Sequence, residues 1–333
     1  MFERLRRILG LDPEARREAR ALAGQVEQLI DACDKRLRLL PGYFDALAPG
    51  MRVSQAYLST LTAQLPPVLE LSLPGFARDP RLGLLFAGPS SLLAFLESSE
   101  VLRDFFLRAG NGDEAWALLT MQRSETNRFG VAMENGELRN DVAQVVVSFD
   151  GHRLMMPSPS QERFRLDSGA HALDVMVSVI ARRLSLMEQA RQQLEAEQAR
   201  LQLRRLSLQS SNCVVVDCQS GDESLPETAA AVDARLAEIN PQLDELRGHA
   251  SLEGLLRTVR EVLEQPADYF SLQTVTLRLS RMGVKVDGDA EDATELALEE
   301  VVLGRMLPIR RALVPVRIRR DDIAELRRQF GGD

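Results

Sequence analysis

The chain has 333 residues, of which 45% are hydrophobic and 27% charged, so it has the composition of a folded protein and the length of two or three domains. Its net charge of −8 argues against a general nucleic-acid binder, because such proteins need a cationic face to displace counterions from phosphate. Aromatic residues make up only 5%, which is typical of helices that pack through aliphatic side chains.

The basic residues, the cysteines and the lengths of the apolar runs bear on the source and the cellular compartment of the protein. All but Lys35 and Lys285 of the 41 basic residues are arginine, a bias that we attribute to a bacterial genome rich in G and C. The three cysteines, Cys33, Cys213 and Cys218, lack metal-type spacing and predict a reducing compartment. The basic amino terminus has no apolar segment behind it, and no apolar run reaches the roughly 20 residues that cross a bilayer. We therefore expect a soluble, cytoplasmic protein.

Residues 1–127 are predicted to form a helical domain. Apolar residues recur at steps of three and four over residues 15–40, which places one apolar stripe on a helix. Cys33 lies on this stripe, so we interpret it as a small core residue and not as a reactive thiol. The last helix of the domain is predicted to start at Asp113 and to carry Trp116 on its buried face.

Over residues 128–160 the spacing of apolar residues is no longer helical, and this segment is predicted to form an antiparallel β-meander. The run at 142–149 is apolar and β-branched, which favours a strand. Asp150-Gly151 is a dipeptide preferred in two-residue type I′ turns, so 152–156 is predicted to be the return strand of a hairpin.

Residues 161–267 predict a long antiparallel coiled-coil hairpin with a connector at about 209–227. Apolar residues recur every seven positions from Leu173 to Leu208, the condition for a left-handed supercoil. A second heptad pattern begins at Val232, and Pro241 within it is expected to kink or restart the helix.

The far half of this arm is predicted to bind a partner. Its heptad row continues with three leucines, but the companion positions four residues later become polar. The companions are Arg191, Gln198 and Arg205. We therefore expect a half-filled seam that binds another protein or a second copy through Leu194, Leu201 and Leu208.

Residues 268–333 are predicted to form an α+β region that could share a sheet with the β-meander. A strand is expected at 275–279, a helix over 293–306, and a strand at 313–318. Pro315 cannot donate to a ladder, so the last strand is predicted to lie at a sheet edge.

The sequence predicts no catalytic, cofactor or metal site. The acidic segment 287–292 resembles the start of a calcium loop but lacks the glycine and glutamate that such a loop needs. The histidines, His152, His171 and His249, have no second ligand at metal-binding spacing, and His152 is predicted to be an exposed strand residue. No phosphate-binding loop or nucleophile elbow is present.

A cluster of arginines near the carboxyl end is the second candidate binding feature. No acid separates Arg305 from Arg320, whereas residues 287–304 carry seven acids and no base. One explanation is internal pairing between the two runs, and the other is a nucleic-acid or phosphate site. The candidate residues are Arg310, Arg311, Arg317, Arg319 and Arg320.

Together these patterns predict a mainly α protein with a smaller β component. The leading hypothesis is a non-enzymatic scaffold or adaptor that acts through protein–protein contacts of the coiled-coil arm. The alternative is a basic patch that binds nucleic acid, which the acidic net charge disfavours, or an anionic membrane surface. The short basic helix at residues 2–9 could add a weak membrane contact. An enzyme whose site is assembled from distant residues remains a second alternative.

Overall fold

The fold is α+β, and its chain divides into two compact units made of interleaved segments. The computed structural model describes residues 13–134, 137–209, 226–286 and 293–331. The predicted basic helix at 2–9, the connector residues Cys213 and Cys218, and the acidic segment 287–292 lie outside these residues. None of the described helices is long and apolar enough to span a membrane.

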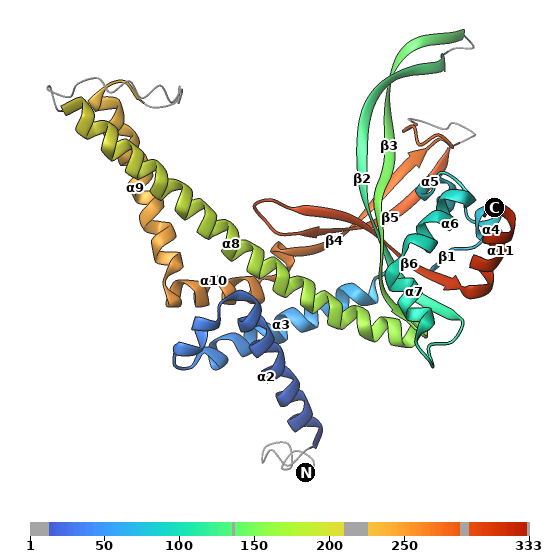
Figure 1. The fold of residues 1–333 in the computed structure, drawn as a ribbon, viewed down its shortest axis with the longest axis horizontal. Helices are drawn as coiled ribbons and strands as arrows, with labels where there is room; N and C mark the ends of the chain where they lie inside the picture. The colour runs from blue at the N-terminus through green and yellow to red at the C-terminus, as the bar shows by residue number, and fades with distance from the viewer. Residues whose placement is uncertain (1–12, 135–136, 210–225, 287–292, 332–333) are drawn as a thin grey trace. The chain divides into compact units, whose positions relative to one another are not determined.

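The helical unit comprises residues 1–54 and 176–266. Helix α3 (Tyr43–Ala63) contributes its first half and α8 (Gln161–Gln209) its part after Val175. The remaining elements are α2 (Pro13–Cys33), η1 (Lys35–Leu39), α9 (Ala229–Ala250) and α10 (Leu252–Glu264), and all are drawn in Figure 1. Burial raises the pKa of the Cys33 thiol to about 12, which fits an unreactive core residue.

Helices α8 and α9 pack against each other in antiparallel fashion, as the heptad rows predict. Leu201 is only 1% exposed and lies in an apolar cluster with Val232, Leu236 and Ile239 of α9. Leu194 and Leu208 are partly buried against the same cluster. Helix α9 therefore fills the predicted half-filled seam at Leu201, whereas Leu194 and Leu208 stay partly exposed.

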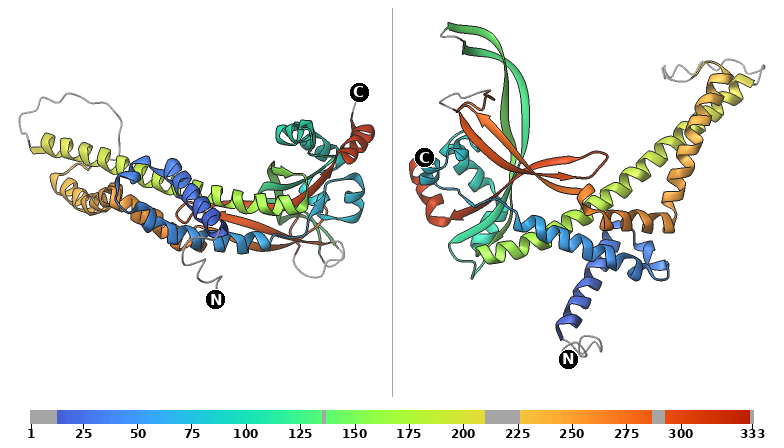
Figure 2. Two further views of the ribbon diagram at one scale, coloured as in Figure 1. Left: turned by 90° about the horizontal axis from the view of Figure 1, so that it is seen from below. Right: turned by 180° about the vertical axis from the view of Figure 1, so that it is seen from behind.

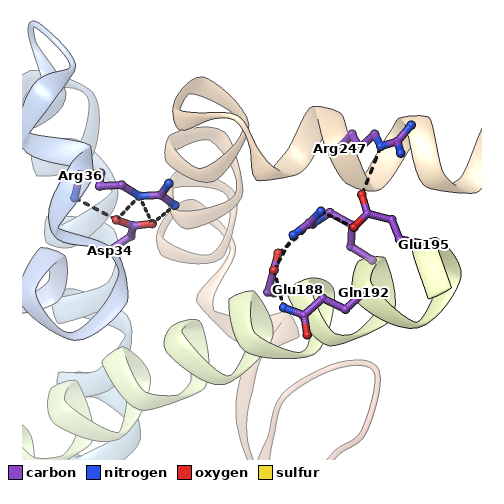
Figure 3. A network of polar contacts seen from close by, with 7 residues as sticks. Asp34, Arg36, Glu188, Gln192, Glu195 and Arg247 are labelled. Carbon is purple, nitrogen blue, oxygen red and sulfur yellow. Dashed lines mark hydrogen bonds and ion pairs between the residues drawn. The ribbon is translucent and has the colours of Figure 1, made fainter.

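The polar residues of α8 at the companion positions of the heptad row find partners on α9 or on α8 itself, so no second partner helix is needed to complete the interface. Gln198 donates to Asn240 Oδ1 of α9 at 2.7 Å, and Arg205 lies 3.4 Å from Asp233. Arg191 is held by two carboxylates of its own helix, Glu188 at 2.6 Å and Glu195 at 2.7 Å. Figure 3 shows Glu188 and Glu195 on α8, with Arg247 of the neighbouring helix facing Glu195. Arg247 of α9 then reaches Glu195 at 3.4 Å. Polar groups thus occupy the positions that apolar companions would fill in a symmetric seam.

The return helix does not restart at Pro241. Helix α9 continues from Ala229 to Ala250, and the break falls instead at Ser251, whose hydroxyl caps α10 by accepting from the Gly254 N–H at 3.0 Å. A phase change in the apolar pattern near Gly248 marks this break in the sequence.

The sheet unit comprises residues 55–175 and 267–333. Its sheet has the strand order β3-β2-β6-β5-β4, with β1 paired to β6 in parallel. The strands are β1 (Leu69–Glu70), β2 (Glu114–Glu134), β3 (Glu137–Ser158), β4 (Phe270–Leu279), β5 (Thr294–Leu303) and β6 (Ile309–Arg319). Helices α4 (Leu73–Arg78), α5 (Arg81–Leu85), α6 (Pro89–Ser98), α7 (Glu100–Leu107) and α11 (Arg320–Phe330) complete it, with the short η2 (Pro266–Asp268) at its border (Figures 1 and 2).

Two segments predicted as helices are strands. Residues 114–121 belong to β2 and pair with β6, and residues 294–303 form β5 between β4 and β6. Both segments are rich in Ala, Leu and Glu, which favour helices weakly. Pairing on both sides overrides that preference, because each strand gains a full ladder of backbone hydrogen bonds and a buried apolar face.

The predicted hairpin turn at Asp150-Gly151 is also wrong. Strand β3 runs on through this dipeptide, and the register with β2 shifts there, between Gln122↔Asp150 and Thr120↔Arg153. Gly151 has φ +60°, which suits a glycine at a β-bulge. The pairing of β2 with β3 runs instead as far as Glu134 and Glu137.

Strand β6 lies in the middle of the sheet, so the edge position predicted from Pro315 is wrong. Pro315 is tolerated because β5 pairs with β6 only as far as Leu313 and β1 begins to pair at Val316. One side of β6 therefore has no strand partner at Pro315, where a missing N–H costs least.

Backbone hydrogen bonds link the strands into a ring. The Val147 N–H donates to the Gly283 carbonyl and the Lys285 N–H to the Val145 carbonyl, each at 2.8 Å. The same short segment returns to β4, since the Val286 N–H donates to the Arg278 carbonyl at 3.0 Å. Residues 283–286 thus close the gap between the first and last strands of the order.

An ion-pair chain accompanies this closure. Glu300 of β5 has a side chain only 3% exposed and pairs with Arg123 of β2. Arg123 also contacts Glu125, and Glu125 accepts from Lys285 Nζ at 2.6 Å. Both basic groups lower the pKa of Glu125. A buried carboxylate with such partners ties β5, β2 and the closing segment together, because loss of one partner leaves an unpaired charge.

The main core of the sheet unit lies between one sheet face and helices α4–α7 and α11. Alternate residues of β2 and β6, such as Leu119 and Val314, are buried there with side chains from the helices. His152 also belongs to this face. Its ring stacks on Phe86 at 4.8 Å, and Nε2–H donates to the Leu85 carbonyl at 2.8 Å. The histidine is half-buried, not exposed as predicted, and desolvation lowers its pKa.

The helix packing predicts unequal roles for two neighbouring leucines. We expect Leu201→Ala to lower the free energy of unfolding by about 2–5 kcal/mol, because it leaves a cavity in the α8–α9 interface. Leu203 is 68% exposed on the same helix, and Leu203→Ala is expected to change the stability by less than ~0.5 kcal/mol. Urea denaturation followed by circular dichroism measures both, and equal effects would contradict the packing.

The buried histidine predicts a pH dependence of stability. Because the folded state lowers the pKa of His152, the unfolded state binds more protons, and stability falls as the pH drops below the unfolded value of about 6.5. His152→Gln keeps a donor for Leu85 but cannot titrate. We expect the wild type to lose more stability than this variant between about pH 7.5 and about pH 5.5, by urea denaturation. Parallel curves would contradict the assignment.

Candidate functional site

The sheet unit contains a largely apolar cavity of about 350 Å³ on the sheet face opposite the main core. Its floor consists of alternate residues of the strands, for example Leu118 and Thr120 of β2 and Arg311 and Leu313 of β6. Successive side chains of a strand point to opposite faces, so the residues between these positions lie in the core on the other side.

A β-bulge in β3 adds two consecutive methionines to the cavity wall. Met155 and Met156 both line the cavity, although neighbouring residues of a regular strand point to opposite faces. The register with β2 shifts at this point, between Trp116↔Ser158 and Leu118↔Met155. Met156 has φ +52°, and in the described chain no other residue except glycine has a positive φ. Backbone strain is therefore located in the wall of the cavity.

Helices α8 and α3 form the opposite wall. Ser168, His171, Ala172 and Val175 follow the i, i+3, i+4, i+7 spacing of one helix face and all line the cavity. On α3, the Tyr57 hydroxyl donates to the Phe270 carbonyl at 2.8 Å, which attaches this helix to β4. Burial raises the pKa of Tyr57, so the hydroxyl stays protonated as the donor.

The ionisable groups of the cavity are all basic. Arg153 and Arg311 line it together with His171, and none of the described lining residues is acidic. Arg311 Nη1 donates to Gln122 Oε1 at 2.8 Å, which leaves its other donors available. Arg153 is an exposed residue, and its guanidinium has no hydrogen-bond or ion-pair partner within the described residues. An anionic group is therefore the natural complement of this site.

The surroundings of His171 favour its neutral form. Desolvation lowers its pKa and outweighs the nearby charge of Asp174, which raises it. A neutral imidazole can donate one hydrogen bond to a ligand, and a bound anion would favour its protonated form.

Ser168 and His171 do not form a catalytic pair. They lie one helical turn apart, but the Ser168 hydroxyl donates to the Phe164 carbonyl at 2.7 Å and not to the imidazole. The described residues show no group of three histidine, cysteine or acidic side chains that could hold a metal ion. The cavity thus combines apolar walls with a few polar side chains from the sheet and from α8, a composition typical of small-molecule pockets.

The arginines singled out in the sequence do not form one free basic patch. Arg317 donates to Glu70 and to Glu114 at 3.1 Å each, and its guanidinium lies 5.5 Å from the Trp116 ring. Arg320 pairs with Asp113 at 3.1 Å. Internal pairing therefore occurs, and the acids that pair with Arg317 and Arg320 among the described residues come from β1, β2 and the segment before β2.

The other arginines of the run have separate surroundings. Arg311 faces the cavity, and Arg310 donates to Gln273 at 3.3 Å. Arg319 is exposed immediately before α11. The sequence analysis missed Arg153, His171 as a cavity residue, and the methionine pair, because each depends on which face of the sheet or helix it occupies.

No family model, curated protein or solved structure was found to match this chain. The cavity and its side chains therefore carry the functional argument alone.

The strained bulge predicts a measurable difference between two variants that both remove the Met156 side chain. We expect Met156→Gly to be more stable than Met156→Ala by about 0.5–1 kcal/mol, because glycine adopts a positive φ without steric cost. The free energy of unfolding from urea titration measures this difference. A more stable alanine variant would show that Met156 does not adopt the left-handed conformation.

Proposed function

We propose that this protein is a non-catalytic binding protein whose cavity receives an amphipathic molecule with an apolar body and one anionic head group. The observation that carries the proposal is the combination of an apolar cavity of about 350 Å³ with Arg153, His171 and Arg311 and no acid among the described lining residues. We place this activity in the cytoplasm, as the cysteine usage predicts.

The size and surface of the cavity support a small organic ligand. Binding pockets for small molecules usually measure about 300–1,000 Å³ and combine apolar walls with a few polar groups. Transfer of an apolar chain from water into such a pocket is favourable in proportion to the area buried. A carboxylate can accept two parallel hydrogen bonds from an arginine, which adds orientation to that energy.

Decanoate is a suitable probe because it has a flexible apolar chain and a carboxylate. We expect isothermal titration calorimetry to detect saturable binding of decanoate, with weaker binding of decanol and of decylamine. Arg153→Gln should weaken decanoate binding by about tenfold or more, because a charge-assisted hydrogen bond is lost. Arg128→Gln, at an exposed position of β2 outside the cavity, is the matched control.

A cavity-filling variant tests the location of the ligand. Ala172 is buried in the cavity wall, and Ala172→Phe is expected to occupy the space and to abolish decanoate binding while the protein stays folded by circular dichroism. Unchanged binding by the folded variant, or no binding of decanoate to the wild type, would contradict the proposed function.

A scaffold or adaptor function through a coiled-coil arm is the second candidate. Helix α9 buries Leu201 of the leucine row that motivated it, so its main support among the described residues is Leu203 and Leu206, which are 68% and 62% exposed on α8. These leucines are three residues apart and lie on neighbouring positions of one helix face. The Leu203→Ala variant introduced above is also informative here, since a scaffold that self-associates through this face would dissociate in light scattering.

A further inference from the structure

The turn between β5 and β6 presents a group of exposed apolar side chains. Met306 is 78% exposed, Leu307 60% and Ile309 38%. Single exposed apolar residues are normal on a protein surface. Three within four positions form a local apolar tip, and such tips are typical of surfaces that contact another molecule.

This turn is anchored at its base. Leu303 pairs with Ile309 as the last pair of β5 and β6 before the turn, and it also pairs with Phe270 of β4, so residues 304–308 form the tip of the β5–β6 hairpin (Figure 1). The Gly304 N–H donates to the Tyr269 carbonyl at 2.7 Å, and Gly304 has φ +86°. A turn held at its base presents its apolar side chains without a large loss of conformational entropy on binding.

Basic residues flank the apolar tip. Arg305 is 64% exposed, and among the described residues its ion pair is a long one, 3.7 Å from Asp268. Arg310 is exposed and donates to the neutral Gln273. The sequence from Gly304 to Arg320 contains no acid. Apolar side chains between arginines match the boundary of an anionic bilayer, where acyl chains lie beneath negatively charged head groups.

We propose that the β5–β6 turn docks on an anionic lipid bilayer, with Met306 and Leu307 inserted among the lipids and Arg305 and Arg310 at the phosphate level. Leu303 and Ile309, at the base of the turn, also line the cavity. Docking would therefore bring the cavity to the membrane, where amphipathic anions are concentrated. This last link rests on the proposed function, whereas docking itself does not.

Vesicle co-sedimentation of the full chain tests the proposal. We expect binding to vesicles of equal parts phosphatidylcholine and phosphatidylglycerol, and little binding to phosphatidylcholine alone. Met306→Ser with Leu307→Ser should reduce the partition coefficient by about tenfold or more, because two apolar side chains no longer insert. Arg305→Gln with Arg310→Gln should reduce it specifically for the anionic vesicles, and added salt should do the same to the wild type.

A matched control lies at the other end of β4. Met282 is 83% exposed, so Met282→Ser removes an equally accessible methionine and is expected to leave vesicle binding unchanged. Decanoate binding by the turn variants separates this proposal from the cavity, since it should persist when vesicle binding is lost. Equal vesicle binding by the wild type and the Met306/Leu307 variant would overturn the proposal. The proposal would also be overturned if the wild type did not bind the vesicles. A third contrary result would be light scattering that shows two copies joined through this turn.

Discussion

The pairing of β2 with β6 is the constraint on which the sheet unit depends. Ala117 lies opposite Val316 and Leu119 opposite Val314, which sends their side chains into the core beneath α4–α7 and α11. The intervening residues then face the cavity. A shift of this register by one residue would exchange the two faces, so the core and the cavity floor are specified together. The cavity is thus a consequence of the same pairing that stabilises the sheet.

Charged groups in this protein mostly complete contacts within each unit. Glu300, Arg123, Glu125 and Lys285 connect strands of the ring, and the polar residues of α8 fill the half of its seam that lacks apolar side chains. Ion pairs on exposed helix surfaces contribute little individually. Their main effect here is to specify which segments meet, because each charge would be unpaired in another arrangement. Arg153 differs from these groups because, in the described part of the chain, its side chain has no such contact.

Both proposals combine apolar side chains with cationic ones, the first for a single ligand molecule and the second for a lipid bilayer. In the cavity, aliphatic walls are joined by arginines and a histidine that suit one anionic head group. At the β5–β6 turn, exposed Met306 and Leu307 stand between arginines that suit a layer of such head groups. Leu303 and Ile309 belong to both surfaces, so a ligand drawn from a membrane would have a short path to the cavity.

The sequence by itself determined the long α8 helix, its packing with α9 and the strands at 142–149 and 313–318, because heptad and alternating patterns are local and repeat many times. It did not determine β2 near Trp116 or β5, whose helix-favouring residues become strands only when neighbouring strands supply their hydrogen bonds. Nor could it identify the cavity. Arg153, His171 and Arg311 are far apart in the chain, and only the sheet register and the helix faces bring them to one surface. The leucine row shows a similar limit, since its period predicted the packing of α8 with α9 but only the tertiary structure shows how far α9 buries each leucine.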